Sequence, residues 1–373
     1  MSMSRRDCLT GLALAGAAAW LPLSARAETQ SPDGGSPSLN AVAQTRGMRF
    51  GSAIGGSHRG PFADPGVRTL MASQCGVMVP ENELKWQAVQ STSAAADFTE
   101  GDKLLAFAQA NGMAMRGHNL LWHNAKWLPK WVNAYDFGSA PAKAAEALLS
   151  EHIFAEIAHY AGNIHSWDVV NETIDEHSGA MRQTVLTEAL GDRVIDLAYH
   201  PAREAAPDAQ LVYNDYMSWG QAGAHRSGVL RLLERLQTDG VPIDALGLQS
   251  HISAGEAPDT RAWAAFLNEV TGMGYALLIT EFDVDDKRLP SAIPERDQAI
   301  ADYARGYLDL TMSYRQLGDV LTWGLVDKYS WLQNDPARTD HLAKRPLPYD
   351  DHYQATPLRQ AIAEAFAAAP ARS

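Results

Sequence analysis

The sequence predicts an α/β fold of the (β/α)8 barrel class, built as a single domain over residues 46–368. After residue 45, eight short apolar runs alternate with longer stretches that are rich in Ala and Leu. Eight strands that are each followed by a helix are typical of a closed barrel of about 250 or more residues. Two further observations favour the barrel. No glycine-rich nucleotide-binding motif follows the first run, and polar residues follow seven of the runs.

The short apolar runs are the expected strands, because such runs bounded by turn residues are typical of buried strands. They cover residues 48–54, 76–80, 113–118, 164–170, 209–214, 245–250, 276–281 and 320–325. The expected helices cover residues 64–74, 100–111, 141–161, 184–205, 222–239, 259–273, 295–317 and 355–368. An open doubly wound sheet is the alternative architecture, and the missing G-x-G-x-x-G and Walker patterns argue against it.

The first 27 residues have the features of an export signal. Arg5 and Arg6 form a twin-arginine pattern, and a mildly apolar stretch over 9–23 follows them. The tripeptide at 25–27 has the A-x-A form of a cleavage site. We therefore expect export by the twin-arginine route to the periplasm or the cell exterior. An anchored or cytosolic N-terminal helix is the alternative, for which the apolar stretch is short.

The segment 28–45 is expected to be a flexible leader, because Ser, Pro and Gly are abundant over residues 28–40. No second linker is apparent beyond it. The formal net charge of −13 argues against nucleic acids and anionic membranes as partners and is compatible with a neutral polymer. No strongly apolar run of about 18 residues follows the N-terminal segment, so the mature chain is expected not to span a membrane.

Two of the apolar runs lead directly to a glutamate. Glu172 lies at the end of the run that begins at Ile164, and Glu281 lies at the end of the run that begins at Ala276. Burying a charge without a partner costs several kcal/mol, so a carboxylate in such a place usually has partners or a function. A helix cap or an arginine partner explains one such residue. Two of them together match the carboxyl pair that cleaves a glycosidic bond.

Polar and aromatic residues also follow the other runs, and in a barrel the carboxyl ends of all strands lie at one face. These residues are Glu81, Asn82, Lys85, Trp86, His118, Trp122, Asn171, Asn214, Tyr216, Gln249, His251, Asp283, Trp323 and Trp331. Strands four and seven of a barrel lie about opposite one another, so Glu172 and Glu281 can flank a sugar. His251 and Asp283 can keep the second carboxylate charged and oriented. The tryptophans offer flat faces for a pyranose ring, with core packing as the alternative for each.

Other chemistries are disfavoured by missing motifs. His118 and His123 are five residues apart and no H-E-x-x-H motif occurs, so neither a catalytic metal nor another cofactor is expected. No G-x-S-x-G nucleophile elbow supports a serine hydrolase. A non-catalytic carbohydrate-binding barrel is the alternative outside the enzymes. The two glutamates together with Asn171 and His251 argue against it.

Eight segments, in order along the chain, carry a resemblance to a known family. They are P-E-N-E-L-K-W (80–86), G-H-N-L-L-W-H (117–123), W-D-V-V-N-E (167–172), Y-N-D-Y (213–216), G-L-Q-S-H (247–251), I-T-E-F-D (279–283), W-G-L-V-D-K-Y-S-W (323–331) and R-P-L-P-Y-D (345–350). Over about residues 46–365 the chain resembles glycoside hydrolase family 10, whose main activity is endo-β-1,4-xylanase. The resemblance implies a retaining enzyme that cleaves internal bonds of xylan through a covalent glycosyl-enzyme. A retaining β-glycanase for short xylo-oligosaccharides or another β-1,4-glycan is the alternative.

The resemblance also implies a role for each site residue. Glu172 is expected to be the general acid/base and Glu281 the nucleophile, with His251 hydrogen-bonded to Glu281. Residues expected on the non-reducing side are Glu81, Asn82, Lys85, Trp323 and Trp331, those around the cleaved bond are His118, Trp122, Asn171 and Gln249, and Tyr216 is expected to stack on the first leaving-side sugar. Asn214 is also expected to bind substrate. We expect a monomer whose partner is xylan or a xylo-oligosaccharide.

The chain departs from the family pattern after the third strand. There the family usually has Ser-Gln and then Pro, whereas residues 124–129 read N-A-K-W-L-P, so that Ala125 stands in place of the usual Gln. We expect an altered non-reducing-side subsite, with Lys126 or Trp127 as candidates for compensation. Met217 replaces a frequent Asn, which predicts weaker leaving-side binding. The role of the charged segment 284–296 is open.

Overall fold

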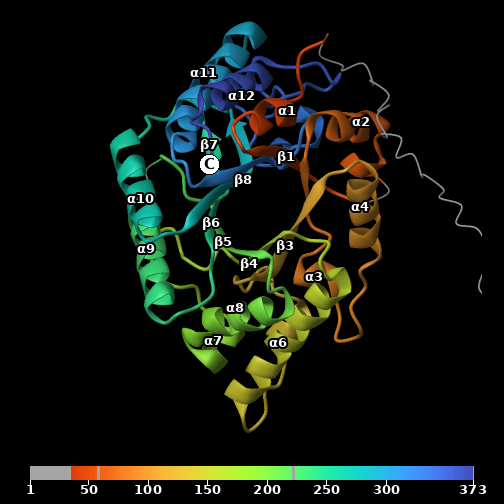
Figure 1. Ribbon diagram of the computed structural model, residues 1–373, viewed down its shortest axis with the longest axis vertical. Coiled ribbons are helices and arrows are strands. Elements are labelled where there is room, and N and C mark those ends of the chain that lie inside the picture. The colour runs from red at the N-terminus through yellow and green to blue at the C-terminus, as the bar shows by residue number, and fades with distance from the viewer. Residues whose placement is uncertain (1–34, 57–58, 221–222, 373) are drawn as a thin grey trace, which may run out of the picture. The chain divides into compact units, whose positions relative to one another are not determined.

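The computed structural model describes residues 35–56, 59–220 and 223–372, and the expected export signal lies outside these ranges. Its centre is a closed barrel of parallel strands (Figure 1). The strands are β1 (Arg49–Ile54), β2 (Val77–Pro80), β3 (Ala114–Trp122), β4 (Ser166–Asn171), β5 (Gln210–Asp215), β6 (Ala245–Leu248), β7 (His251–Ser253), β8 (Ala276–Asp285) and β9 (Leu317–Thr322). Strands β6 and β7 together form the sixth of eight barrel positions, because both pair with β8. The pairing of β9 with β1 closes the ring, which confirms the predicted (β/α)8 class.

Helices surround the barrel and connect its strands (Figure 1). They are α1 (Leu39–Gln44), α2 (Pro65–Gln74), α3 (Trp86–Val89), α4 (Thr99–Ala110), α5 (Lys130–Asn133), α6 (Pro141–Tyr160), α7 (Val185–Leu190), α8 (Arg193–Ala205), α9 (Gly223–Thr238), α10 (Thr260–Gly272), α11 (Ile293–Met312) and α12 (Pro357–Ala368). One predicted helix, 184–205, is two helices in the structure. Gly191 has a φ of 62° at the end of α7, a left-handed conformation that glycine adopts without steric cost and that ends the helix.

Strand β8 is longer than the predicted strand, which ended at residue 281. Beyond that point acidic and apolar residues alternate along the strand. Phe282 stacks on Tyr307 of α11, with ring centroids 6.2 Å apart, while Glu281 and Asp283 both bind His251. Side chains of a strand point alternately to its two faces, so the carboxylates lie on the site face and Phe282 on the helix face. The continuous apolar run therefore ends before the strand does.

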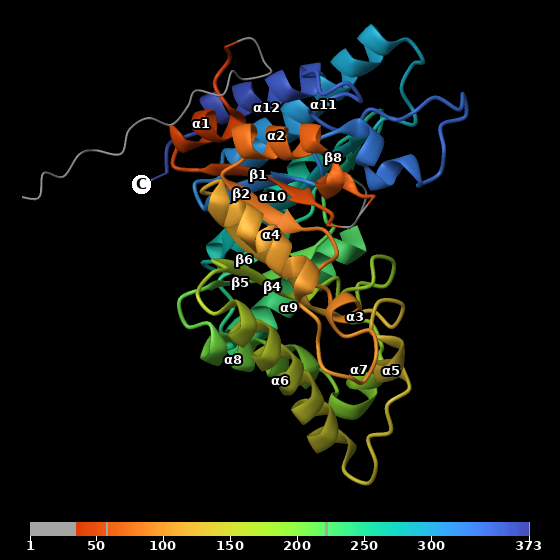
Figure 2. The same cartoon turned by 90° about the vertical axis from the view of Figure 1, so that its right-hand side faces the viewer.

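The predicted flexible leader is wrong for residues 39–44, which form helix α1. The Ser38 side chain accepts a hydrogen bond from the Ala41 N–H and caps this helix. Leu39 and Ala43 are fully buried, and α1 packs against α12 (Figure 2). The Pro- and Ser-rich composition before residue 38 obscured this short apolar helix in the sequence.

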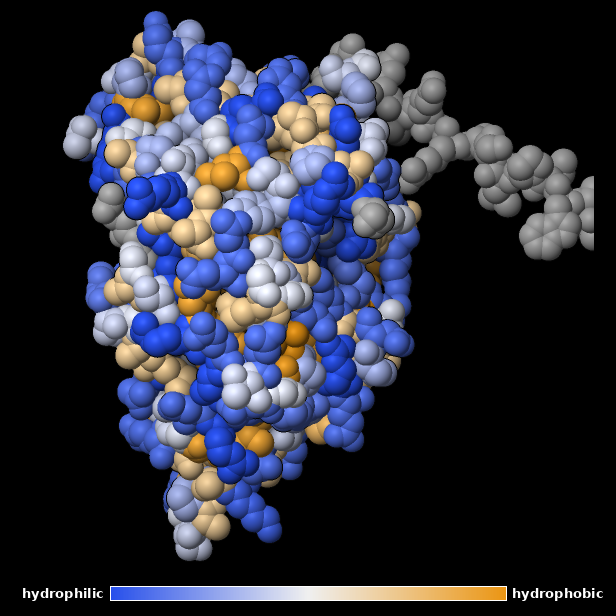
Figure 3. Space-filling view, turned by 60° about the vertical axis from the view of Figure 1, so that its left-hand side comes forward, coloured by the Kyte–Doolittle hydropathy of each residue, from blue (hydrophilic) through white to orange (hydrophobic). Residues whose placement is uncertain are grey.

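The outer surface is mainly polar on the face drawn in Figure 3, where apolar side chains are scattered among hydrophilic ones. In the part of the chain that the structure describes, no helix combines the length and apolar character needed to cross a lipid bilayer.

Candidate active site

The carboxyl ends of the barrel strands lie where the short helices α3, α5 and α7 follow β2, β3 and β4 (Figure 2). Glu172 directly follows β4 and has a φ of 53°, which is uncommon for a residue other than glycine. Its N–H donates to the Asn214 carbonyl at 2.9 Å. Both carboxylate oxygens accept hydrogen bonds, Oε2 from Trp122 Nε1 at 2.9 Å and Oε1 from Gln249 Nε2 at 2.9 Å. The carboxyl group is thus held by β3 and by the loop after β6.

Glu281 lies within β8 and forms a chain of hydrogen bonds with its neighbours. His251 donates from Nε2 to Glu281 Oε2 at 3.2 Å and from Nδ1 to Asp283 Oδ1 at 2.9 Å. Trp331 Nε1 donates to the other oxygen of Asp283 at 2.7 Å. The imidazole is therefore fixed between two carboxylates of one strand, and Glu281 has a defined orientation.

Asn214 of β5 connects the two glutamate-bearing strands. Its Nδ2 donates to Glu281 Oε1 at 2.7 Å and to Asn171 Oδ1 at 2.9 Å, and its Oδ1 accepts from Thr280 at 2.7 Å. Both amide hydrogens are thus donated to protein atoms, and the residue is fully buried. The sequence predicted a substrate-binding residue here, whereas in the structure Asn214 orients the side chains of Glu281 and Asn171 through hydrogen bonds.

The two glutamates have pKa values shifted in opposite directions. Burial raises the pKa of Glu172, and the nearby charges of Asp215 and Glu281 raise it further, against hydrogen bonds that lower it. Burial alone would also raise the pKa of Glu281, but the hydrogen bond and charge of His251, with His118 nearby, lower it below its usual value. One carboxyl is therefore suited to hold a proton and the other to stay ionised.

His251 supplies positive charge beside Glu281. Burial by itself lowers the pKa of this histidine, but the carboxylates of Asp283 and Glu281 outweigh that effect and raise it. Both ring nitrogens donate to carboxylates, as a protonated imidazole does. The cation therefore stabilises the ionised form of Glu281.

One wall of the site contains a buried lysine between aromatic rings. Lys85 donates to Asn82 Oδ1 at 2.9 Å, and its Nζ lies 4.6 Å from the ring centre of Trp122. It also lies 5.9 Å from the ring centre of Trp323. Glu81, Trp323 and Trp331 line one hollow next to this wall. The structure thus brings together the five residues predicted for the non-reducing side.

Tyr216 is linked to Glu172 through Arg182. Its hydroxyl accepts a hydrogen bond of 2.8 Å from Arg182, whose Nε donates to the Glu172 carbonyl at 3.1 Å. An open polar hollow of about 300 Å³ adjoins this arginine. It is lined by Asn124, Ala125, Asp175, Met181, Arg182 and Gln183. Arg182 was not among the predicted site residues, because nothing in the sequence places it beside Tyr216.

The arrangement combines a carboxyl that favours the protonated form with a second, ionised carboxylate. Tryptophan rings and hydrogen-bonding groups surround both. Such a pair can protonate a glycosidic oxygen and attack an anomeric carbon. Within the described ranges, no three His, Cys, Asp or Glu side chains are grouped so that they could hold a metal ion.

The model of the family described as glycosyl hydrolase family 10 matches residues 38–365 of this sequence. The chain belongs to glycosyl hydrolase family 10. It is 31% identical over 331 residues to endo-1,4-beta-xylanase A of Phanerodontia chrysosporium, a match that covers 88% of this chain and 77% of that protein. The family predicted from the eight sequence segments is thereby confirmed.

Solved structures of family 10 have the same fold. Native xylanase 10B of Thermotoga maritima aligns with a TM-score of 0.79 and 27% identity, over 88% of this chain and 98% of that one. Xylanase 10B of Thermotoga petrophila RKU-1, in complex with xylobiose, aligns with a TM-score of 0.80 and 26% identity, over 89% of this chain and 97% of that one.

The structure shows the surroundings of Ala125 and Met217, the two residues that depart from the family 10 pattern. Ala125 lines the polar hollow that Arg182 also lines, and the altered non-reducing-side subsite expected from this replacement stays a prediction. The Met217 side chain is fully buried in the hydrophobic core, so it does not face the site. The weaker leaving-side binding expected from this replacement stays a prediction.

Two further residues differ from what the sequence predicted. Trp86 was a candidate sugar-stacking residue, but it is 2% exposed and stacks on His152 with ring centres 4.1 Å apart. Asp168 was not predicted, yet its carboxylate accepts from His118 Nδ1 at 2.9 Å and pairs with Arg116. Arg116 and His118 are two residues apart on β3, and this spacing was the available signal for a shared partner on the next strand.

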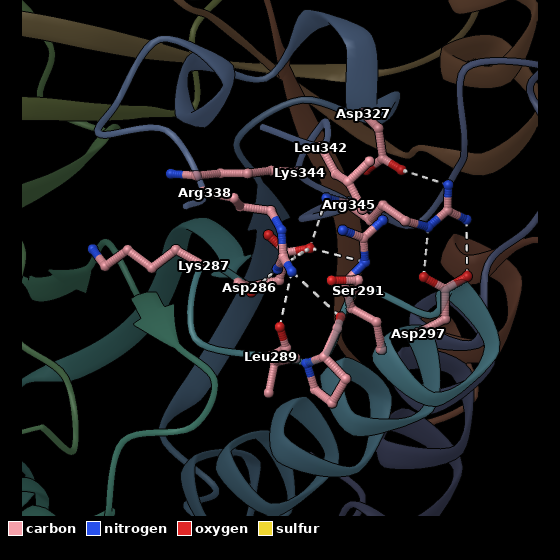
Figure 4. Close-up of polar contacts among 12 residues, drawn as sticks. Asp286, Lys287, Leu289, Ser291, Asp297, Asp327, Arg338, Leu342, Lys344 and Arg345 are labelled. Carbon is pink, nitrogen blue, oxygen red and sulfur yellow. Dashed lines mark hydrogen bonds and ion pairs between the residues drawn. The ribbon is translucent and has the colours of Figure 1, made fainter. Parts of the chain in front are cut away.

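The charged segment 284–296 is bound to the loop after Trp331 (Figure 4). Arg338 is almost completely buried and donates to the carbonyls of Asp286 and Leu289, the latter at 2.8 Å. Lys344 lies 3.2 Å from Asp285, at the end of the strand that contains Glu281. We call these contacts the loop clamp, defined by Asp285, Asp286, Arg338 and Lys344. It connects the loop that begins with Trp331 to β8.

Proposed function

We propose that this family 10 protein is a retaining endo-1,4-β-xylanase that hydrolyses internal β-1,4-xylosidic bonds of xylan by double displacement. The observation that carries the proposal is the pair Glu172 and Glu281, which lie at the same barrel end with pKa values shifted in opposite directions. The family match and the xylanases among its relatives support xylan as the substrate.

In the first step, the Glu281 carboxylate attacks the anomeric carbon of the sugar at the cleaved bond. Glu172 donates its proton to the glycosidic oxygen, and the leaving chain departs as an alcohol. This forms a covalent ester between the sugar and Glu281. Asn214 and His251 each donate one hydrogen bond to Glu281, so the attacking group keeps its orientation.

In the second step, Glu172 is ionised and takes a proton from an incoming water molecule. The water attacks the same anomeric carbon from the face that the leaving chain has vacated, and the bond to Glu281 breaks. Two inversions retain the β configuration. The hydrogen bonds from Trp122 and Gln249 favour the ionised form of Glu172, which this step requires.

The substrate is expected to bind with sugars on both sides of the bond that Glu172 protonates. We assign the sugars on the non-reducing side to Glu81, Asn82, Lys85, Trp323 and Trp331. Tyr216 is assigned to the first leaving-side sugar, held in place by Arg182. Aromatic faces suit the apolar faces of a pyranose, and the polar groups suit its hydroxyls.

A product time course from unbranched β-1,4-xylan tests the endo character. The proposal expects mixed oligomers of intermediate length to appear early, before small products accumulate. Release of small products alone from the first time points would contradict it. Cleavage of xylo-oligosaccharides without release from the polymer would identify the alternative, an enzyme that acts after depolymerisation.

We also propose that the protein is exported by the twin-arginine route, with cleavage after Ala27, and acts as a monomer. The twin arginines at 5 and 6 support the export route, and the A-x-A tripeptide at 25–27 supports the cleavage position. Cells that lack twin-arginine transport should retain the uncleaved chain in the cytosol. Normal export of the mature protein from those cells would exclude this route.

A further inference from the structure

The loop over residues 124–129, where this chain departs from the family 10 pattern, has a defined conformation. The Asn124 carbonyl accepts the N–H groups of Trp127 and Leu128 at 2.8 and 3.1 Å, and its side chain accepts the N–H of Lys126 at 3.0 Å. Asn133 of α5 donates to the Ala125 carbonyl at 2.8 Å. These bonds fix where the Trp127 side chain leaves the backbone.

Trp127 is packed on a residue that contacts the expected proton donor. Its ring lies nearly parallel to that of Trp122, with centroids 4.6 Å apart and an interplanar angle of 15°. Trp122 in turn donates its indole N–H to Glu172 Oε2 at 2.9 Å. The three side chains therefore form a continuous series from the departing loop to the carboxyl group.

We infer that Trp127 is a positioning residue for acid/base catalysis, because it holds the Trp122 indole in the orientation that bonds Glu172. The inference rests on the proposed role of Glu172. An indole at the end of a strand can rotate about two side-chain bonds, and a stacked partner restricts that rotation. Without the stack, the Trp122 ring keeps its contact with Lys85 but loses the aromatic partner that restricts its rotation, so its N–H is held less firmly toward the carboxylate.

The surroundings of Glu172 determine the sign of the effect. Asp215 and Glu281 face it with negative charge, Lys85 faces it with positive charge, and Gln249 donates a hydrogen bond. The Trp122 hydrogen bond lowers the pKa of Glu172. Weakening that bond should therefore raise this pKa and move the basic limb of the kcat/KM profile to higher pH, since the protonated acid persists longer.

The test compares Trp127→Ala with Trp127→Phe, which keeps an aromatic ring on Trp122. Tyr135→Ala is the matched control, because Tyr135 is an exposed aromatic residue near the same loop that contacts Trp131 and not Trp122. Each variant is assayed for kcat/KM on phenyl β-xylobioside and on dinitrophenyl β-xylobioside. The phenolate leaving group needs a proton from Glu172, and the dinitrophenolate leaves without one.

We expect Trp127→Ala to lose about three- to tenfold in kcat/KM on the phenyl substrate, the range that one aromatic stack represents. On the dinitrophenyl substrate it should stay close to wild type, and its basic limb on the phenyl substrate should shift upward. Trp127→Phe should restore most of the loss. Trp122→Phe lacks the indole N–H, so adding Trp127→Ala to it should cause little further loss.

Equal losses on both substrates with an unmoved basic limb would show a merely structural role and overturn the inference. Wild-type behaviour of Trp127→Ala on both substrates would also overturn it. Thermal unfolding of each variant detects loss of folding. Glu172→Gln separates the two proposals: without a leaving-group-dependent loss in that variant the acid/base assignment fails, whereas with it only the role of Trp127 is in question.

Discussion

At the scale of single residues, charge and hydrogen bonding distinguish two chemically identical side chains. Glu172 accepts from two neutral donors and faces the carboxylates of Asp215 and Glu281. Glu281 instead accepts from Asn214 and from the cationic His251. The difference in partners, more than the difference in burial, separates their protonation states.

Replacing His251 by Ala should impair the nucleophile in a pH-dependent way. Loss of the cation raises the pKa of Glu281, and only the ionised carboxylate can attack. The acidic limb of the kcat/KM profile should therefore move to higher pH, with a loss of about tenfold or more at neutral pH. A His159→Ala variant, in a partly exposed position on α6, is the control. An acidic limb that stays in place in His251→Ala would show that the histidine does not set the charge of Glu281.

Glu156 is a second buried glutamate, and it lies outside the site on α6. Its two oxygens have no hydrogen-bond partner among the described residues, and His152 Nε2 is 3.6 Å from one of them. Burial raises the pKa of Glu156 well above its usual value and lowers that of His152 to about 4. Burial therefore favours the neutral form of both groups in the folded protein.

The Glu156 carboxyl should cost stability as the pH rises. The pKa of Glu156 is higher in the folded than in the unfolded chain. Its protonation therefore stabilises the fold fully below the unfolded pKa, and this stabilisation is lost as the pH rises from the unfolded to the folded pKa. Glu156→Gln removes this titration. The free energy of unfolding of the variant minus that of wild type should be larger at pH 8 than at pH 4.5, as measured by urea unfolding at both pH values. A stability difference that is the same at both pH values would contradict the assignment.

At the scale of elements, the loop clamp connects the Trp331 loop to β8, the strand of the nucleophile. Asp286 and Arg338 are both buried, 3.6 Å apart, and Arg338 also donates to two backbone carbonyls. Trp331 reaches the same strand through Asp283. The clamp therefore defines the wall that we assign to the non-reducing side.

Replacing Arg338 by Met should destabilise the fold, because it leaves the Asp286 carboxylate and the loop carbonyls without this partner. The expected loss is about 3–5 kcal/mol in the free energy of unfolding, measured with urea. Lys287→Met is the matched control, since its pair with Asp285 is about one-third exposed on the lysine side and should contribute at most about 1 kcal/mol. Equal losses in the two variants would show that burial does not increase the contribution of these ion pairs to the free energy of unfolding.

At the scale of the whole molecule, apolar periodicity was enough to predict the barrel and the end of it that contains the site. Each strand was placed within a few residues, because buried strands are short and apolar on both faces. Apolar periodicity does not reveal β8 beyond Glu281, where polar and apolar residues alternate, or the short helix α1, which follows a Pro- and Ser-rich segment.

The sequence was sufficient to predict most residues of the site, but it was less informative about which of them contact one another. Glu172, Glu281 and His251 could be identified because each follows or ends an apolar run. Arg182 and Asn214 acquire their partners only when distant strands and loops meet around the closed barrel. The positions of Ala125 and Met217 relative to the site likewise depend on the direction of each side chain, which sequence spacing did not specify.

The most direct test of the central claim, that Glu172 and Glu281 act as a retaining pair, is the anomeric form of the first product. Proton NMR during hydrolysis of xylopentaose should show the β anomer first, with the α anomer arising later by mutarotation. In parallel, Glu281→Ala should lose nearly all activity on dinitrophenyl β-xylobioside. An α anomer formed first, or near-normal activity of Glu281→Ala, would contradict the double-displacement mechanism.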